Sequence, residues 1–207
     1  MSVDKLLDYN LIDLVFVLIP LFVFLAVIEM LVVYVFKFKQ KNDSKEWFLN
    51  VFLGVSSFPI NASFGFITIA ALFWAKSYQI YTLPFTLPVL VVCFILDDFR
   101  FYLHHRIVHR WRWGWGLHRA HHTSERFALD VGARQPWTKH FTGTMMLKVP
   151  LVLIGFDPIM VLFCGFMNAY YQFLLHTQTI KKLPSWYEYI FNTPSHHRVH
   201  HGKNPKY

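Results

Sequence analysis

The stretch LIDLVFVLIPLFVFLAVIEMLVVYVF, residues 11–36, is apolar apart from Asp13 and Glu29. A helix needs roughly 20 such residues to cross a hydrocarbon core about 30 Å thick, so this stretch can span a bilayer with some tilt. It is too long for the apolar region of a signal peptide, and no small-residue cleavage site follows it. The sequence therefore predicts an integral membrane protein that keeps this span.

The composition of the whole chain agrees with lipid as the solvent. Of the 207 residues, 55% are hydrophobic and only 15% are charged, whereas soluble domains carry about a quarter charged residues. Cys93 and Cys164 lie far apart in apolar runs, so no disulfide framework is expected. The formal net charge of +8 does not indicate a nucleic-acid partner, because the basic residues gather at the ends of apolar segments.

Three further apolar segments predict an all-α protein with about four transmembrane helices. They cover about residues 51–75, 87–103 and 141–175. GFDP at residues 155–158 interrupts the last segment, and Gly and Pro favour a turn, so we expect a helical hairpin over about residues 141–176. Residues 1–97 are assigned to N-terminal membrane helices, and residues 98–207 to a second domain that includes the hairpin.

The basic residues predict the orientation of these spans. Only Lys5 precedes the first span, whereas four lysines follow it: Lys37, Lys39, Lys41 and Lys45. Cytoplasmic loops are enriched in Lys and Arg, which assigns this loop to the cytosol. Counting crossings from there places every histidine cluster on the cytosolic face. The membrane would be a bacterial inner membrane or the endoplasmic reticulum.

All twelve histidines lie between His104 and His201, and most belong to three boxes with helical spacing. The boxes are His105-x-x-x-His109, His118-x-x-His121-His122 and His197-x-x-His200-His201. Residues three and four apart share a helix face, so each box can point its imidazoles at one spot. Imidazole suits zinc, copper, iron, cobalt and nickel. Three such boxes on one predicted face are not expected by accident, so the sequence predicts metal binding.

The number of histidines favours two metal ions. Eight box histidines exceed the four or so ligands of one tetrahedral ion, and two ions with about four imidazoles each fit the count. His176, at the end of an apolar segment, is a candidate ninth ligand. His104 and His196 adjoin box residues but face differently on a helix, so neither is expected to be a ligand. His140 stands alone and is expected at the surface or the membrane interface.

The boxes and their surroundings resemble the fatty acid hydroxylase/sterol desaturase superfamily. DFRFYLHHRIVH (98–109), HRAHHTSERF (118–127) and TPSHHRVHHGKNPKY (193–207) are similar to its three motif regions. The spacing of the first two boxes and the pair Arg134-Gln135 are most similar to the alkylglycerol monooxygenase-like branch. Family members usually continue beyond the position of Tyr207, so the resemblance implies a chain that is shortened at its C-terminus.

The resemblance implies a membrane-bound di-iron oxygenase with a helical, cytosolic-side cap that holds the metals. Such an enzyme uses O2 and an external reductant, from an electron-donor protein or a reduced pterin, to hydroxylate or desaturate a fatty acyl, alkyl-ether or sterol lipid. The implied metal ligands are His105, His109, His118, His121, His122, His176, His197, His200 and His201. Asp98, Tyr102 and Glu125 would orient imidazoles at the catalytic centre. For Asp98, an interfacial charge unrelated to metal is the alternative.

A membrane metal carrier or sensor is the main alternative function. Such a protein would place histidines or acids inside its spans as a pathway. Here the spans offer Glu29, with Asp97 and Asp98 near an end, and a polar neighbour in the bundle can satisfy Glu29. A zinc hydrolase is a weaker alternative, because the boxes lack a nucleophile motif and the usual carboxylate base. The sequence therefore favours an enzyme.

Overall fold

The computed structural model describes residues 43–124 and 126–203, together with a few residues between 20 and 32. Every regular element in this part of the chain is a helix, which confirms the all-α prediction there. The predicted first span over residues 11–36 lies largely outside the described residues, as does Glu125.

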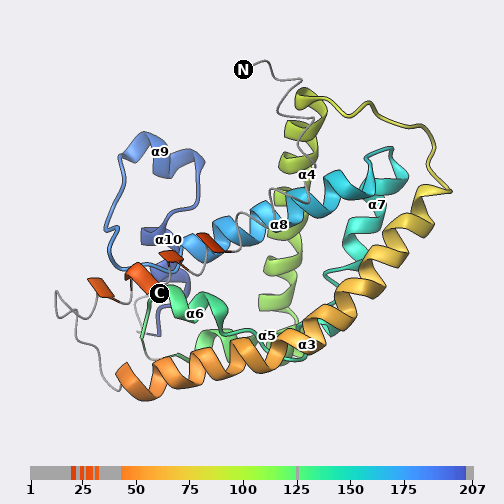
Figure 1. Ribbon diagram of the computed structural model, residues 1–207. Helices are drawn as coiled ribbons and strands as arrows, with labels where there is room; N and C mark the ends of the chain where they lie inside the picture. Colours follow the sequence, from red (N-terminus) through yellow and green to blue (C-terminus); the bar gives the residue numbers. More distant parts are fainter. Residues whose placement is uncertain are drawn as a thin grey trace.

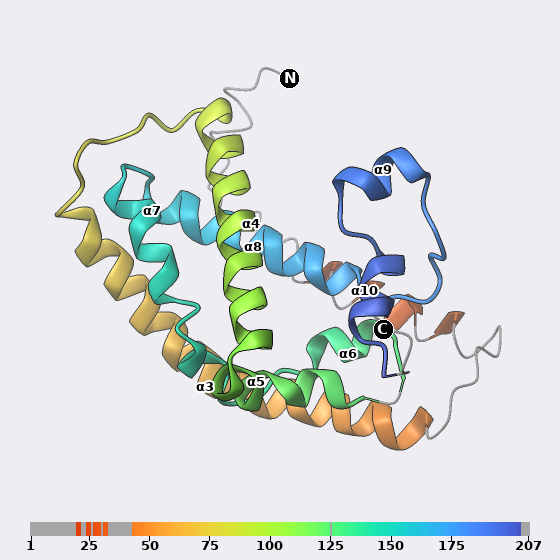
Figure 2. The ribbon, with the colours of Figure 1, turned by 180° about the vertical axis from the view of Figure 1, so that it is seen from behind.

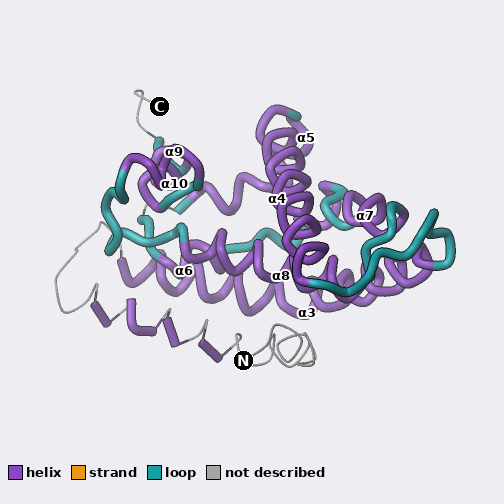
Figure 3. Tube along the Cα trace, turned by 90° about the horizontal axis from the view of Figure 1, so that it is seen from above, coloured by secondary structure: helices purple, strands orange, loops and turns teal. Residues whose placement is uncertain are grey.

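The elements keep the labels of Figure 1, where α denotes an α-helix and η a short 3-10 helix. In chain order they are α3 (Asp43–Lys76), α4 (Leu87–Arg110), α5 (Arg112–His118), η1 (Arg119–Thr123), α6 (Leu129–Ala133), η2 (Lys139–Thr142), η3 (Met146–Lys148), α7 (Val149–Leu153), α8 (Pro158–Leu174), α9 (Ser185–Ile190) and α10 (Pro194–His200). Helices α4 and α8 cross and pack together, and α3 runs along one side, where it contacts α6 and α7 (Figures 1 and 2). Seen from above, α3 lies on the opposite side of α8 from α9 and α10 (Figure 3).

Helix α3 is the strongest candidate for a membrane span. Its 34 residues make it about 50 Å long at 1.5 Å per residue. By length and hydropathy it is the one helix in the described part of the chain that could cross a membrane. Helix α8 is apolar but has 17 residues, which is at the lower limit for a crossing. The structure therefore supports one of the predicted spans.

One side of α3 faces the segment from α5 to η2 (residues 112–142), hereafter the α5–η2 segment. The residues on this side repeat every three or four positions, as expected for one helix face: Glu46, Asn50, Gly54, Ser57 and Asn61. Asn50 donates to Asp130 Oδ2 at 2.7 Å. A Cβ atom on Gly54 would lie 3.0 Å from the Ala133 carbonyl oxygen, so the two backbones approach closely. Helix α3 is thus held through a polar face.

His140 is part of this contact, and the prediction of a surface position for it is wrong. The ring is buried, stacks on Phe64 with 4.7 Å between centroids, and places Nε2 2.6 Å from Asn61 Oδ1. The Asn61 amide oxygen satisfies Nε2 of this buried ring, whereas Nδ1 has no hydrogen-bond partner among the described residues.

The apolar core lies where α3, α4, α7 and α8 meet. It includes Leu72, Cys93, Val152, Met160 and Cys164. Both cysteines are buried and free.

Charged side chains are buried at two separate places in the fold. Asp97 on α4 pairs with Arg100 at 2.7 Å and with Lys148 at 3.1 Å. The buried Glu29 carboxylate accepts the Leu129 N–H at 2.6 Å and the Thr177 hydroxyl. The expectation of a polar partner for Glu29 is therefore confirmed. Charges at this depth are stable because each has a partner.

The predicted turn at residues 155–158 is confirmed, but the first leg of the hairpin is not one helix. Gly155 has φ +115°, and the Asp157 side chain caps α8 by accepting the Ile159 N–H at 2.8 Å. Before the turn the chain forms η2, η3 and the five-residue helix α7. Gly143, with φ +79°, follows η2, and a left-handed residue interrupts a right-handed helix.

Replacing Gly155 with alanine should destabilise the protein more than the same change at Gly143. Both residues have positive φ, which costs a residue with a side chain about 1–2 kcal/mol. A Cβ on Gly155 would also lie 2.7 Å from the Tyr81 carbonyl oxygen, whereas nothing lies within 4 Å of one on Gly143. Thermal unfolding in detergent measures the difference. Equal melting temperatures for the two variants would contradict this account of the turn.

Candidate metal centre

Eight histidines converge in two groups of four. The first histidine group contains His105, His109, His122 and His200, and the second contains His121, His176, His197 and His201. In each group, every histidine offers one ring nitrogen, and these four nitrogens all lie within 4.8 Å of one another. Helix α4 supplies two members of the first group, and His176 of the second group lies just after the end of α8. Both η1 and the α10 region contribute to each group.

The two H-x-x-H-H boxes do not each point at one spot as expected. His121 belongs to the second group and its neighbour His122 to the first, and the pair His200 and His201 divides in the same way. Consecutive residues are separated by about 100° on an α-helix and about 120° on a 3-10 helix such as η1, so adjacent imidazoles diverge. The His122 and His201 rings stack with 4.2 Å between centroids. The two groups are therefore immediate neighbours.

The other predicted and dismissed histidines also have defined positions. His118 lies beside the first group, with Nε2 3.2 Å from His122 Nε2. His176, expected as a possible ninth ligand, lies inside the second group. His104 is turned away and places Nε2 2.9 Å from the Thr142 hydroxyl. His196 is exposed and belongs to neither group.

Backbone carbonyls fix the protonation of two imidazoles in the second group. His121 Nδ1 lies 3.2 Å from the Arg134 carbonyl oxygen, and His176 Nδ1 lies 2.8 Å from the Gln172 carbonyl oxygen. A carbonyl only accepts, so in each ring Nδ1 carries the proton and Nε2 has a free lone pair in the neutral form. These two Nε2 atoms face each other at 3.1 Å. Two lone pairs at this distance repel unless a cation lies between the rings.

The remaining features of the groups also fit a metal ion. His109 Nε2 and His201 Nε2 are buried and have no hydrogen-bond partner within the described chain. Burial lowers the pKa of His121 well below its ordinary value, and the neighbouring His176 imidazole adds to this effect. Burial and the nearby His109 imidazole lower the pKa of His118 to about 3 and that of His200 to about 4. The imidazoles are therefore neutral near pH 7, as metal ligation requires.

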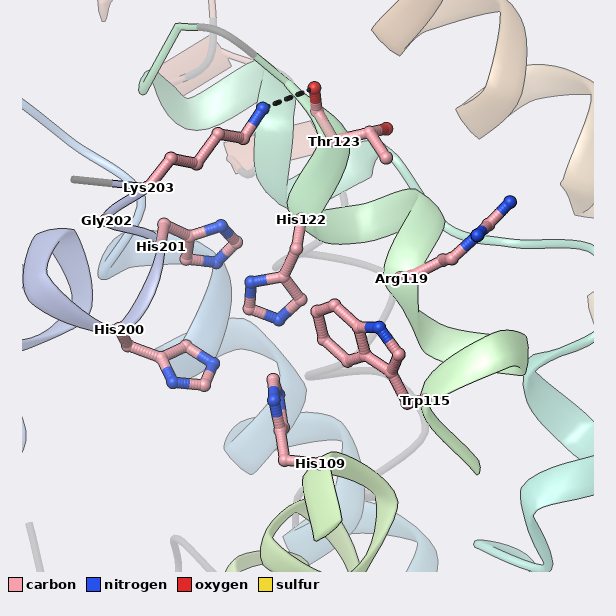
Figure 4. Close-up of a pocket in the computed structure, with 9 residues that line it drawn as sticks. All are labelled: His109, Trp115, Arg119, His122, Thr123, His200, His201, Gly202 and Lys203. Carbon is pink, nitrogen blue, oxygen red and sulfur yellow. Dashed lines mark hydrogen bonds between the residues drawn. The ribbon is translucent and has the colours of Figure 1, made fainter. Parts of the chain in front are cut away.

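A cavity of about 480 Å³ opens onto both groups. Figure 4 shows His109, His122 and His200 of the first group together with His201 of the second, all gathered at the cavity. Trp115 covers one side of the cavity, with 5.2 Å between its ring centroid and that of His109. Lys203 closes another side by donating to the Thr123 carbonyl oxygen at 2.9 Å. Arg119 points away from the rings (Figure 4). A small molecule in this cavity would contact ligands of both groups.

Asp98 and Tyr102, two of the three residues expected to orient imidazoles, make no hydrogen bond to an imidazole among the described residues. The Tyr102 hydroxyl accepts from Arg106 at 2.9 Å. Glu125 is outside the described residues. The groups that hold His121 and His176 are instead the carbonyls of Arg134 and Gln172. Residue type gives no signal for a backbone carbonyl, so sequence reasoning could not have found them.

Acidification should destabilise the metal-free protein between about pH 6.5 and about pH 3. Unfolded imidazoles take up protons near pH 6.5, whereas folded His200 does so at about 4 and folded His118 at about 3. In this window the unfolded state binds more protons, so the free energy of unfolding falls as the pH falls. Thermal unfolding of chelator-treated protein over this range measures the effect. A His118→Phe variant should show a shallower dependence, and an unchanged slope would contradict the assignment.

Replacing Gly132 with alanine should weaken metal binding about tenfold, as loss of a ligand's support commonly does. A Cβ on Gly132 would lie 2.9 Å from Phe173 Cδ2 and 3.1 Å from His176 Nδ1, so it would displace the imidazole. Gly116→Ala is the matched control, because nothing lies within 4 Å of a Cβ there. Metal titration of the purified variants measures the change. Equal affinities would show that His176 is not held by this contact.

Comparison with known proteins identifies relatives that are named as oxygenases and hydroxylases. The sequence profile described as "Fatty acid hydroxylase" matches residues 90–207, which is more than half of the chain. Alkylglycerol monooxygenase from Homo sapiens is 32% identical over 187 residues, which cover 89% of this chain and 41% of that protein. Alkylglycerol monooxygenase from Danio rerio is 39% identical over 114 residues, which cover 55% of this chain and 25% of that protein.

A bacterial relative extends the range of similar proteins. Ornithine lipid hydroxylase OlsE from Rhizobium tropici is 28% identical over 137 residues, which cover 62% of this chain and 40% of that protein. The chain thus spans at most about two fifths of the length of these curated relatives. No solved structure matches it. With its profile match over more than half of its length, the chain belongs to the fatty acid hydroxylase family.

Proposed function

We propose that this protein is a membrane-bound, di-iron lipid monooxygenase. The observation that carries the proposal is the pair of neighbouring four-histidine groups in a chain whose relatives are named monooxygenase and hydroxylase. One oxygen atom of O2 would enter a C–H bond of the lipid. The other would leave as water, with two electrons and two protons from an external donor.

The donor set supports two metal ions, one in each histidine group, with His118 as a further ligand beside the first. Imidazole binds zinc, copper and iron, but zinc has no redox chemistry, and a monooxygenase needs a redox-active ion. Iron bound here would supply the activation of O2. The described histidine groups contain no carboxylate. Neutral imidazole ligands would therefore leave the positive charge of the ions uncompensated.

The protein's own residues would orient the reactants and exclude water. The second group is the drier one, because His121, His176 and His197 are buried. The cavity touches ligands of both groups, so we assign it to O2 and the reacting carbon. Trp115 would exclude water from one side of this space. The protein would thus position the reactants and exclude water, while the ions would supply the oxidation chemistry.

The names of the relatives favour an amphiphilic lipid substrate. An alkylglycerol and an ornithine lipid share a polar head on a long chain, and both enzymes are named for oxygen insertion. We therefore propose hydroxylation of an alkyl-ether or acyl lipid in preference to desaturation or to a sterol substrate. The centre would lie on the cytosolic face of the membrane, where an electron-donor protein or a reduced pterin has access.

His121→Ala and His200→Ala should each reduce bound iron and abolish lipid-dependent oxygen consumption. Each change removes one imidazole from a different group. Iron content and oxygen uptake, measured with reductant and alkylglycerol in detergent, report the two effects separately. His196→Ala is the matched control, because His196 lies in neither group.

The same measurements separate the enzyme from a metal carrier or sensor. A carrier would bind metal but consume no oxygen when lipid and reductant are supplied. Full iron content and full oxygen uptake in both alanine variants would overturn the assigned ligands.

A further inference from the structure

We infer that Arg134 is a positioning residue that holds the second histidine box in place by tying it to α3. The inference rests on the proposed function, since it concerns the same metal centre. Arg134 is 5% exposed and follows α6 in the α5–η2 segment. The Arg134 guanidinium donates no hydrogen bond to a histidine of either group among the described residues. It acts instead through the short helix η1.

Arg134 binds both ends of η1 and one of its histidines. Its Nε donates to the Ala120 carbonyl oxygen at 2.9 Å, and its Nη2 donates to the Thr123 hydroxyl at 2.6 Å. Its backbone carbonyl accepts from His121 Nδ1 at 3.2 Å. One residue therefore sets the position of η1 and the proton position on a ligand.

The same guanidinium reaches α3. Nη1 donates to Glu46 Oε2 at 3.0 Å and to Asn50 Oδ1 at 2.9 Å. Glu46 Oε2 also accepts from the Ser124 hydroxyl at 2.8 Å, just after η1. A buried charge is costly unless it is paired and hydrogen-bonded, and these contacts satisfy Arg134. The anchor for η1 is therefore the first turns of the candidate membrane helix.

Helix η1 needs this support because it is weak by itself. It has five residues and no side-chain cap, and 3-10 hydrogen bonds have poorer geometry than α-helical ones. Yet it carries His121 of the second group and His122 of the first. Loosening η1 would move one ligand of each ion, so the effect would reach both ions together.

An arginine is required for this set of partners. Its planar guanidinium presents donors in three directions at fixed angles, whereas a lysine offers one nitrogen at the end of a flexible chain. Lysine at position 134 could satisfy α3 or η1 but not both. Arg134→Lys therefore keeps the positive charge but removes the simultaneous hydrogen bonds to α3 and η1.

The experiment titrates Co2+ into purified protein in detergent and records the visible absorption bands of the bound ion. For Arg134→Lys we expect about tenfold weaker binding, the lower end of what loss of a ligand's support costs, together with shifted bands. Band positions report the ligand geometry, and a change in global stability alone would not move them. Thr123→Val, which removes one acceptor with little change in shape, should shift the bands in the same direction with a smaller loss of affinity. Arg112→Lys, at an exposed arginine, is the matched control and should match the unmodified protein.

The outcomes separate this inference from the proposed function. If the unmodified protein binds no Co2+, the metal centre itself is wrong. If it binds two ions and a folded Arg134→Lys gives the same affinity and bands, the positioning role is overturned. If Arg134→Lys does not fold, Thr123→Val decides alone: unchanged bands overturn the inference, and shifted bands support it.

Discussion

The two facing nitrogens of His121 and His176 are the constraint on which the centre depends. Each ring gives its Nδ1 proton to a backbone carbonyl, so neither ring has a proton to place between Nε2 atoms 3.1 Å apart. Adding a proton there would create a buried charge, which the low pKa of His121 opposes. A bound cation removes the repulsion and uses both lone pairs. Metal binding and folding of this region are therefore expected to be coupled, as in other sites built from separate chain segments.

The division of the adjacent histidine pairs makes the two groups one centre. Because His121 and His122 diverge, and His200 and His201 do the same, η1 and the α10 region each hold a ligand for both groups. A displacement of either element changes both groups at once. The stacked His122 and His201 rings leave little room for independent movement. This geometry suits a reaction in which two ions act on one molecule, and it explains why one buried arginine beside η1 can influence the whole centre.

The sequence predicted those features that depend on local patterns. Apolar runs predicted α3, α4 and α8, and GFDP predicted the turn before α8, because length, periodicity and turn chemistry are encoded within a few residues. The features it missed depend on partners far along the chain. Asn61 breaks an apolar run without an evident reason until His140 is placed 79 residues later. Glu46 and Arg134 are 88 residues apart, and neither residue type indicates the other. The boxes predicted convergence, but only the helix geometry separates neighbouring histidines into different groups.

The two faces of α3 favour a position for the metal centre close to lipid. In its first half, the side toward the α5–η2 segment is polar, while Phe48, Val55 and Phe58 on the other side are largely exposed. A helix with this pattern is stable where one face meets lipid and the other meets protein. Arg134 and Asp130 bind the polar face directly, so the segment that carries the second histidine box rests on a helix whose outer face suits hydrocarbon. Such an arrangement suits a substrate whose reacting C–H bond belongs to an amphiphile.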